Sequence, residues 1–127
     1  MSHPVPHVPV SWGELVDKIT ILEIKTARLE GHARANAAHE LELLLACAAP
    51  VAAETAPFKA RLKALNEALW GIEDRIRDKE RAQSFDDDFI ALARSVYHRN
   101  DERGRIKREI NQLLGSELVE EKNYSPY

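Results

Sequence analysis

The sequence predicts an all-α protein, an antiparallel bundle of three or four helices dominated by a long C-terminal helical hairpin. Apolar residues recur every three or four positions over most of the 127 residues, and no strand-like alternation is found. A short polar turn near Phe85 separates the two longest periodic stretches, which places them antiparallel. We expect an extended arm at 1–10, one helical domain at 11–115, and an acidic, aromatic tail at 116–127 that packs on the bundle.

The first helix is predicted from a capping box, because Ser11 is followed three positions later by Glu14. Three prolines before it favour an extended arm. The helix should run to about Glu30, with Gly31 as its stop. Its main apolar face follows near-heptad spacing and comprises Trp12, Leu15, Val16, Ile19, Leu22, Thr26 and Leu29. Apolar Ile21 and Ile24 lie off this face, so the helix is either central in the bundle or half of an oligomer interface, and we expect a homodimer.

An alanine-rich second helix is expected at 33–48, either separate from the first or a kinked continuation of it. Its predicted packing face comprises Leu41, Leu44 and Leu45. Cys47 is the only cysteine, so it excludes a disulfide within the chain, and we expect it to be a small core residue. Residues 50–57 contain two prolines and predict a linker, with Pro57 in the first turn of the next helix.

The third helix, 57–83, is predicted from strict four-three-four-three-four spacing of Phe58, Leu62, Leu65, Leu69, Ile72 and Ile76. After a short turn, Asp86 is the expected N-cap of a fourth helix that ends at Gly115. Asp87 and Asp88 then favour the positive end of the helix dipole. A metal site on these three aspartates is the alternative interpretation.

Composition excludes several classes of function. The net charge of −3 argues against a general nucleic-acid partner. We find no apolar run of about 18 residues and no signal sequence, so we expect a cytoplasmic protein without a membrane partner. Phosphate-binding glycine loops, zinc-protease motifs and nucleophile elbows are absent, and no cofactor is predicted.

The candidate site is a break in the apolar stripe of the fourth helix, where Asn100 and Arg103 replace apolar residues. Unpaired buried polar groups are costly, so these two side chains need partners. Antiparallel pairing places them opposite the middle of the third helix. We therefore predict a polar layer of Asn66, Glu73, Asn100 and Arg103, with Trp70 and Tyr97 as aromatic walls.

Glu23 of the first helix is the expected carboxylate partner of Arg103, whereas Asp17 and Lys18 are interpreted as surface residues in ion pairs. Three interpretations of the layer stay open. It fixes helix register; it binds an anionic or polar small molecule through Arg103 and Lys107; or it holds Mg²⁺. The ligands of that magnesium site would be Glu23, Glu73 and Asp74.

Three long strings resemble a family of short bacterial proteins of unknown function. They are VSWGELVDKITILEIK at 10–25, LNEALWGIEDRIR at 65–77 and ARSVYHRNDERGRIKREINQLLGSELVEEKNYSPY at 93–127. The resemblance implies a setting beside cell-surface glycan genes, and it implies a tail strapped to the bundle. The polar residues in the strings are Glu67, Trp70, Glu73, Asp74, Arg77, Tyr97, Asn100, Asp101, Arg103, Lys107, Asn111, Glu120, Lys122 and Tyr124.

Two functions of different classes follow. The first is a small cytoplasmic binding or accessory protein linked to surface-glycan biosynthesis, acting through the polar site or a protein partner. The alternative is an enzyme acting on an anionic metabolite such as a nucleotide-linked sugar, with Glu73 or Glu23 as general base or Mg²⁺ ligand. A fainter likeness to the all-helical chorismate mutases, with Arg28, Arg103 and Lys107 as anion ligands, serves only as an analogy.

Overall fold

The computed structural model describes residues 2–127, and their regular structure is entirely helical. The helices are α1 (Trp12–Arg28), α2 (Gly31–Ala48), α3 (Ala52–Ala82) and α4 (Asp87–Leu114), with a single 3₁₀ turn, Ala49–Val51, between α2 and α3. No strand occurs among the described residues. The predicted all-α class is therefore confirmed.

Three helix ends follow the predicted caps. The Ser11 hydroxyl accepts a hydrogen bond from the Glu14 backbone N–H at 3.1 Å, and the Asp86 carboxylate accepts one from the Phe89 N–H at 3.0 Å. Gly115 ends α4 in the left-handed conformation with φ of 58°. These ends were predictable because each depends on residues close together in the sequence.

The predicted linker at 50–57 is wrong. Helix α3 begins at Ala52, and Pro57 lies inside it. Alanine-rich residues favour a helix, and a proline costs least near a helix start, so the helix extends five residues upstream of Pro57. Gly31 is the first residue of α2, with φ of 60°, and α1 ends at Arg28. Helices α1 and α2 are therefore separate.

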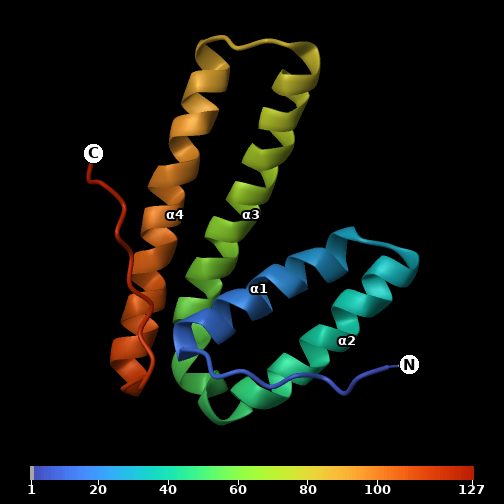
Figure 1. Ribbon diagram of the computed structural model, residues 1–127, viewed down its shortest axis with the longest axis vertical. Helices are drawn as coiled ribbons and strands as arrows, with labels where there is room; N and C mark the ends of the chain where they lie inside the picture. The colour runs from blue at the N-terminus through green and yellow to red at the C-terminus, as the bar shows by residue number, and fades with distance from the viewer. Residues whose placement is uncertain (1) are drawn as a thin grey trace.

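Helices α3 and α4 lie side by side, joined by residues 83–86, and α1 crosses their lower part with α2 on its outer side (Figure 1). The main core cluster comprises Val16, Leu62, Leu65, Ile106 and Ile110, from α1, α3 and α4. We call this lower part of the structure the base. We call residues 73–99 the tip; only Leu92 is buried there. The base therefore holds the core and the polar groups described below.

Two side chains of α2 lie elsewhere than predicted, and Ile24 of α1 takes the central one of its two predicted positions. Ile24 is 2% exposed within the single chain, so it offers no apolar surface to a second copy. Cys47 is exposed instead of in the core, and Leu45 of the predicted packing face is 41% exposed. Both belong to the outer side of α2, which packs on α1 and leaves its opposite face open.

One helical stretch among residues 2–127, Gly31–Ala82, is long and apolar enough to cross a membrane on those two criteria, although the sequence predicted no such span. The chain bends between α2 and α3 (Figure 1), and α2 alone has 18 residues. Length and composition are weak evidence, because helices of water-soluble proteins pass the same test.

Candidate functional site

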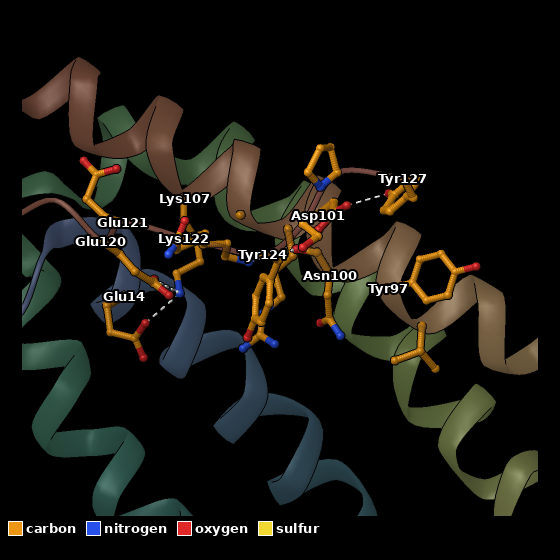
Figure 2. A pocket seen from close by; sticks show the side chains of 16 residues that line it. Glu14, Tyr97, Asn100, Asp101, Lys107, Glu120, Glu121, Lys122, Tyr124 and Tyr127 are labelled. Carbon is orange, nitrogen blue, oxygen red and sulfur yellow. Dashed lines mark hydrogen bonds and ion pairs between the residues drawn. The ribbon is translucent and has the colours of Figure 1, made fainter.

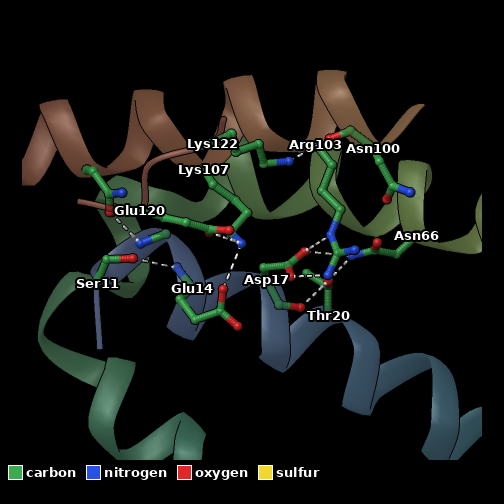
Figure 3. Close-up of polar contacts among 12 residues, drawn as sticks. Ser11, Glu14, Asp17, Thr20, Asn66, Asn100, Arg103, Lys107, Glu120 and Lys122 are labelled. Carbon is green, nitrogen blue, oxygen red and sulfur yellow. Dashed lines mark hydrogen bonds and ion pairs between the residues drawn. The ribbon is translucent and has the colours of Figure 1, made fainter. Parts of the chain in front are cut away.

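The centre of the base is a buried ion pair between α1 and α4 (Figure 3). The Arg103 Nε donates to the Asp17 Oδ1 at 2.8 Å, and a terminal guanidinium nitrogen donates to Oδ2. The Asp17 side chain is 1% exposed and that of Arg103 is 27% exposed. The Asp17 hydrogen bond raises the pKa of Arg103 above its ordinary value. The charge of Arg103 is therefore neutralised within the chain.

Helix α3 joins this pair through Asn66. Its amide donates to the Asp17 Oδ1 at 3.0 Å and to the Thr20 hydroxyl at 2.9 Å, and that hydroxyl donates to the Asp17 backbone carbonyl at 2.7 Å. No buried side-chain nitrogen or oxygen among residues 2–127 lacks a hydrogen-bond partner. We call Asp17, Thr20, Asn66 and Arg103 the polar layer; of the four predicted members, Glu73 and Asn100 are not part of it. A fully satisfied layer of this kind holds three helices in register.

The predicted partner of Arg103 was wrong. Glu23 bonds instead to Lys59 at 2.9 Å and to Lys63 at 3.5 Å. Asp17 was expected at the surface, yet it is buried. The overlooked signal is a second face of α1 at four-three-four spacing, made of Gly13, Asp17, Thr20 and Ile24. Gly13 on this face lets another helix approach closely, and Asp17 and Thr20 supply polar contacts with neighbouring helices.

Gly13 brings α1 and α4 into backbone contact. Its N–H donates to the Asn111 side-chain carbonyl at 2.7 Å. A Cβ at this position would lie 2.5 Å from the backbone oxygen of Lys107. No residue larger than glycine fits without moving one helix. This contact places the Lys107 side chain beside Glu14, one turn from the polar layer.

Lys107 is enclosed by two carboxylates (Figure 3). Its ammonium donates to Glu14 at 2.7 Å and to Glu120 of the tail at 2.5 Å, and its side chain is 9% exposed. Burial alone would lower the pKa of Lys107, but the hydrogen bonds to Glu120 and Glu14 outweigh it and raise the pKa. The same bond lowers the pKa of Glu120. The predicted anion anchor is therefore already paired.

The tail returns along α4 (Figure 1) and forms with it an open groove of about 1420 Å³ (Figure 2). The Tyr127 hydroxyl donates to the Asp101 carboxylate at 2.5 Å, which raises the pKa of that tyrosine. The Tyr97 and Tyr127 rings pack at 5.1 Å between centroids. The groove is lined by Glu14, Val96, Tyr97, Asn100, Asp101, Arg103, Gly104, Lys107 and Glu120 to Tyr127. It therefore combines aromatic rings with charges of both signs.

A smaller hollow of about 510 Å³ lies between α1, α3 and α4. Its apolar lining comprises Ile21, Ile24, Leu69, Trp70 and Val96, and its polar lining comprises Asn66, Glu73, Asp74, Arg77, Asn100 and Arg103. The predicted site residues are thus divided. Trp70 and Glu73 line the hollow, Tyr97 and Lys107 line the groove, Asn100 and Arg103 line both, and Glu23 lines neither.

The structure does not bring together the predicted magnesium ligands. Glu73 is exposed and pairs with Arg77 of its own helix at 3.6 Å, and Glu23 binds lysines. Among residues 2–127, no three His, Cys, Asp or Glu side chains lie close enough to hold a metal ion. Asp86 caps α4 and pairs with Lys79 at 2.8 Å, as the capping interpretation of the aspartates requires.

Comparison with known proteins identifies a family. The sequence model of a family described as "Family of unknown function (DUF6165)" matches residues 6–126 of the chain. Neither a curated protein nor a solved structure matches the chain. The predicted resemblance to a family of unknown function is confirmed, whereas the bacterial origin and the glycan-gene setting stay predictions.

Proposed function

The chain belongs to the DUF6165 family, whose function is unknown, and we propose that it is a small binding protein whose groove takes a hydroxyl-rich, sugar-like molecule. The observation that carries this proposal is the lining of the groove. Three tyrosines, several carboxylates and two side-chain amides face one open space between α4 and the tail. A small number of polar groups that converge beside aromatic rings is typical of small-molecule sites.

The tyrosines supply the apolar part of such a site. Tyr97 is 42% exposed, Tyr124 is 83% exposed and Tyr127 is 72% exposed, although aromatic rings gain free energy when covered. A sugar ring has a C–H face that covers an aromatic ring while its hydroxyls point outward to polar groups. The exposed tyrosine rings therefore favour a ligand with one flat apolar face.

The polar groups supply hydrogen bonds for hydroxyls. The Asn100 side-chain amide is half-buried, and no hydrogen bond is found for it among residues 2–127. It can donate and accept, while the Glu121 carboxylate can accept from hydroxyls. The cations of the groove are Arg103, Lys107 and Lys122, and its carboxylates are Glu14, Asp101, Glu120 and Glu121. This near balance favours a ligand whose polar groups are mainly hydroxyls.

This ligand chemistry supports the predicted setting in surface-glycan biosynthesis. In that setting the chain acts in the bacterial cytoplasm as an accessory protein that holds a glycan precursor. The antiparallel α3–α4 hairpin and the crossing α1 serve as the rigid support of the groove. The expected general bases, Glu23 and Glu73, make ion pairs outside the groove, and this placement favours binding over catalysis.

The proposal is tested by measuring the binding of neutral mono- and disaccharides with thermal-shift assays and titration calorimetry. A ligand at 100 times its Kd adds about 2.7 kcal/mol to the free energy of unfolding. Tyr124→Ala should weaken binding at least about fivefold without lowering stability, because removing a central aromatic contact costs about 1–3 kcal/mol. Phe85→Ala is the matched control, since Phe85 is a 52% exposed aromatic outside the groove. No binding across the panel, or equal affinities for both variants, would contradict the proposal.

A further inference from the structure

We infer that Glu120 occupies, in the free protein, the subsite for an anionic group of the groove's ligand, so that binding of this ligand displaces residues 118–121 of the tail. The ligand is then a sugar-like molecule that carries a phosphate or carboxylate. This inference rests on the proposed function and adds the charged part of the ligand and the movement that admits it.

The subsite is built around the Lys107 ammonium. Its side chain is 9% exposed, and its two carboxylate partners differ in how they are held. Glu14 belongs to α1, which Gly13 holds in backbone contact with α4. Glu120 belongs to a segment without regular structure. An anion in place of the Glu120 carboxylate would receive the same charge-assisted hydrogen bond.

The other charged groups near Lys107 do not compete for that role. Arg103 is bound bidentately by Asp17, and the Lys122 ammonium donates to the Asn100 backbone carbonyl at 3.4 Å. Replacing the Glu120 carboxylate by a ligand anion leaves both contacts of Lys107 satisfied. The exchange therefore needs no new buried charge to be left unpaired.

The tail is held by side chains alone. Its last backbone–backbone hydrogen bond is from the Ser116 N–H to the Asn111 carbonyl, and every residue from 117 to 127 is exposed. Beyond Glu120, Glu121 pairs with Arg108 at 3.6 Å, whereas the end of the tail is held by the contacts of Tyr127 with Asp101 and Tyr97. Exposed ion pairs contribute little to stability. Lifting residues 118–121, with the end of the tail in place, is therefore inexpensive compared with moving a helix.

The experiment uses inorganic phosphate as probe, titrated at constant ionic strength into the wild type, Glu120→Gln and Glu117→Gln. Glu117→Gln is the matched control, because it removes the same charge from the tail without touching Lys107. We expect Glu120→Gln to bind phosphate roughly fivefold tighter than the control, the gain from removing a half-exposed competing pair. Lys107→Arg, which keeps the charge, should retain binding.

The movement is measured by ¹⁵N relaxation of residues 118–121, which reports picosecond-to-nanosecond mobility. Saturating phosphate should make these residues of the wild type as mobile as those of free Glu120→Gln. Equal phosphate affinities of Glu120→Gln and Glu117→Gln, or immobility of residues 118–121 at saturation, would overturn the inference. Neutral-sugar binding sensitive to Tyr124→Ala would then leave the proposed function standing. If no neutral sugar binds but phosphate still displaces Glu120, the sugar-binding proposal is wrong and the anion subsite stands.

Discussion

The base and the tip both contain α3 and α4, yet they differ in how the side chains of these helices are covered. In the base, Leu62 and Ile110 are 0% exposed. In the tip, Phe85 is 52% exposed and Ile90 is 53% exposed, and Leu92 is the buried residue. Helix α1 crosses only the base (Figure 1). A third helix, and not the apolar periodicity of α3 and α4, therefore decides which apolar residues enter the core.

The polar contacts of the two regions differ in the same way. The Asp17–Arg103 pair joins residues 86 positions apart and is buried on its acidic side. The tip has local, exposed pairs such as Arg81 with Asp78 at 3.0 Å. Exposed pairs contribute about 0–1 kcal/mol, whereas breaking a buried pair costs several. We expect most of the stability to reside in the base.

The largest effect should come from Asp17→Ala. It leaves Arg103 without its carboxylate and Asn66 without one acceptor, and it should lower the free energy of unfolding by about 3 kcal/mol. Denaturant unfolding measures this loss. Asp74→Ala, at an exposed position of α3, should change stability by less than about 0.5 kcal/mol. If the two variants are equally stable, the base does not depend on its polar layer.

An intermediate effect should come from two glycine substitutions, one at the contact of α1 with α4 and one at an open position of α3. Gly13→Ala places a Cβ 2.5 Å from the Lys107 carbonyl oxygen and should destabilise by about 1–3 kcal/mol. Gly71→Ala has nothing within 4 Å of the added Cβ in α3 and should stabilise by up to about 1 kcal/mol. Thermal unfolding of both variants measures the difference, and the same sign for both would contradict the close contact of α1 with α4.

The smallest effect should come from the tip, at the N-cap of α4. The Lys79 ammonium and the Phe89 N–H hold the pKa of Asp86 down to about 2. Because this pKa is lowered on folding, the cap contributes above the ordinary aspartate pKa and is lost as the pH falls through about 2. An NMR titration of the carboxyl measures the pKa directly. Lys79→Met should raise the Asp86 pKa, and hydrogen exchange in the first turn of α4 should quicken only locally.

The sequence by itself determined the helical class and several helix ends. Ser11, Asp86 and Gly115 act through hydrogen bonds to residues a few positions away, so local chemistry suffices to predict them. It also identified Arg103 as a charged group that needs a partner and Lys107 as a candidate anion ligand. These conclusions hold whatever lies opposite each helix.

Only the tertiary structure decided which partners those groups have. Asp17, and not Glu23, meets Arg103, because the Gly13 contact fixes where α1 crosses α4. Glu120 reaches Lys107 because the tail folds back along α4. Helical periodicity specifies which residues share a face, but the crossing of helices distant in sequence decides what covers that face. The groove likewise depends on tertiary structure, because it forms only where the tail folds back along α4.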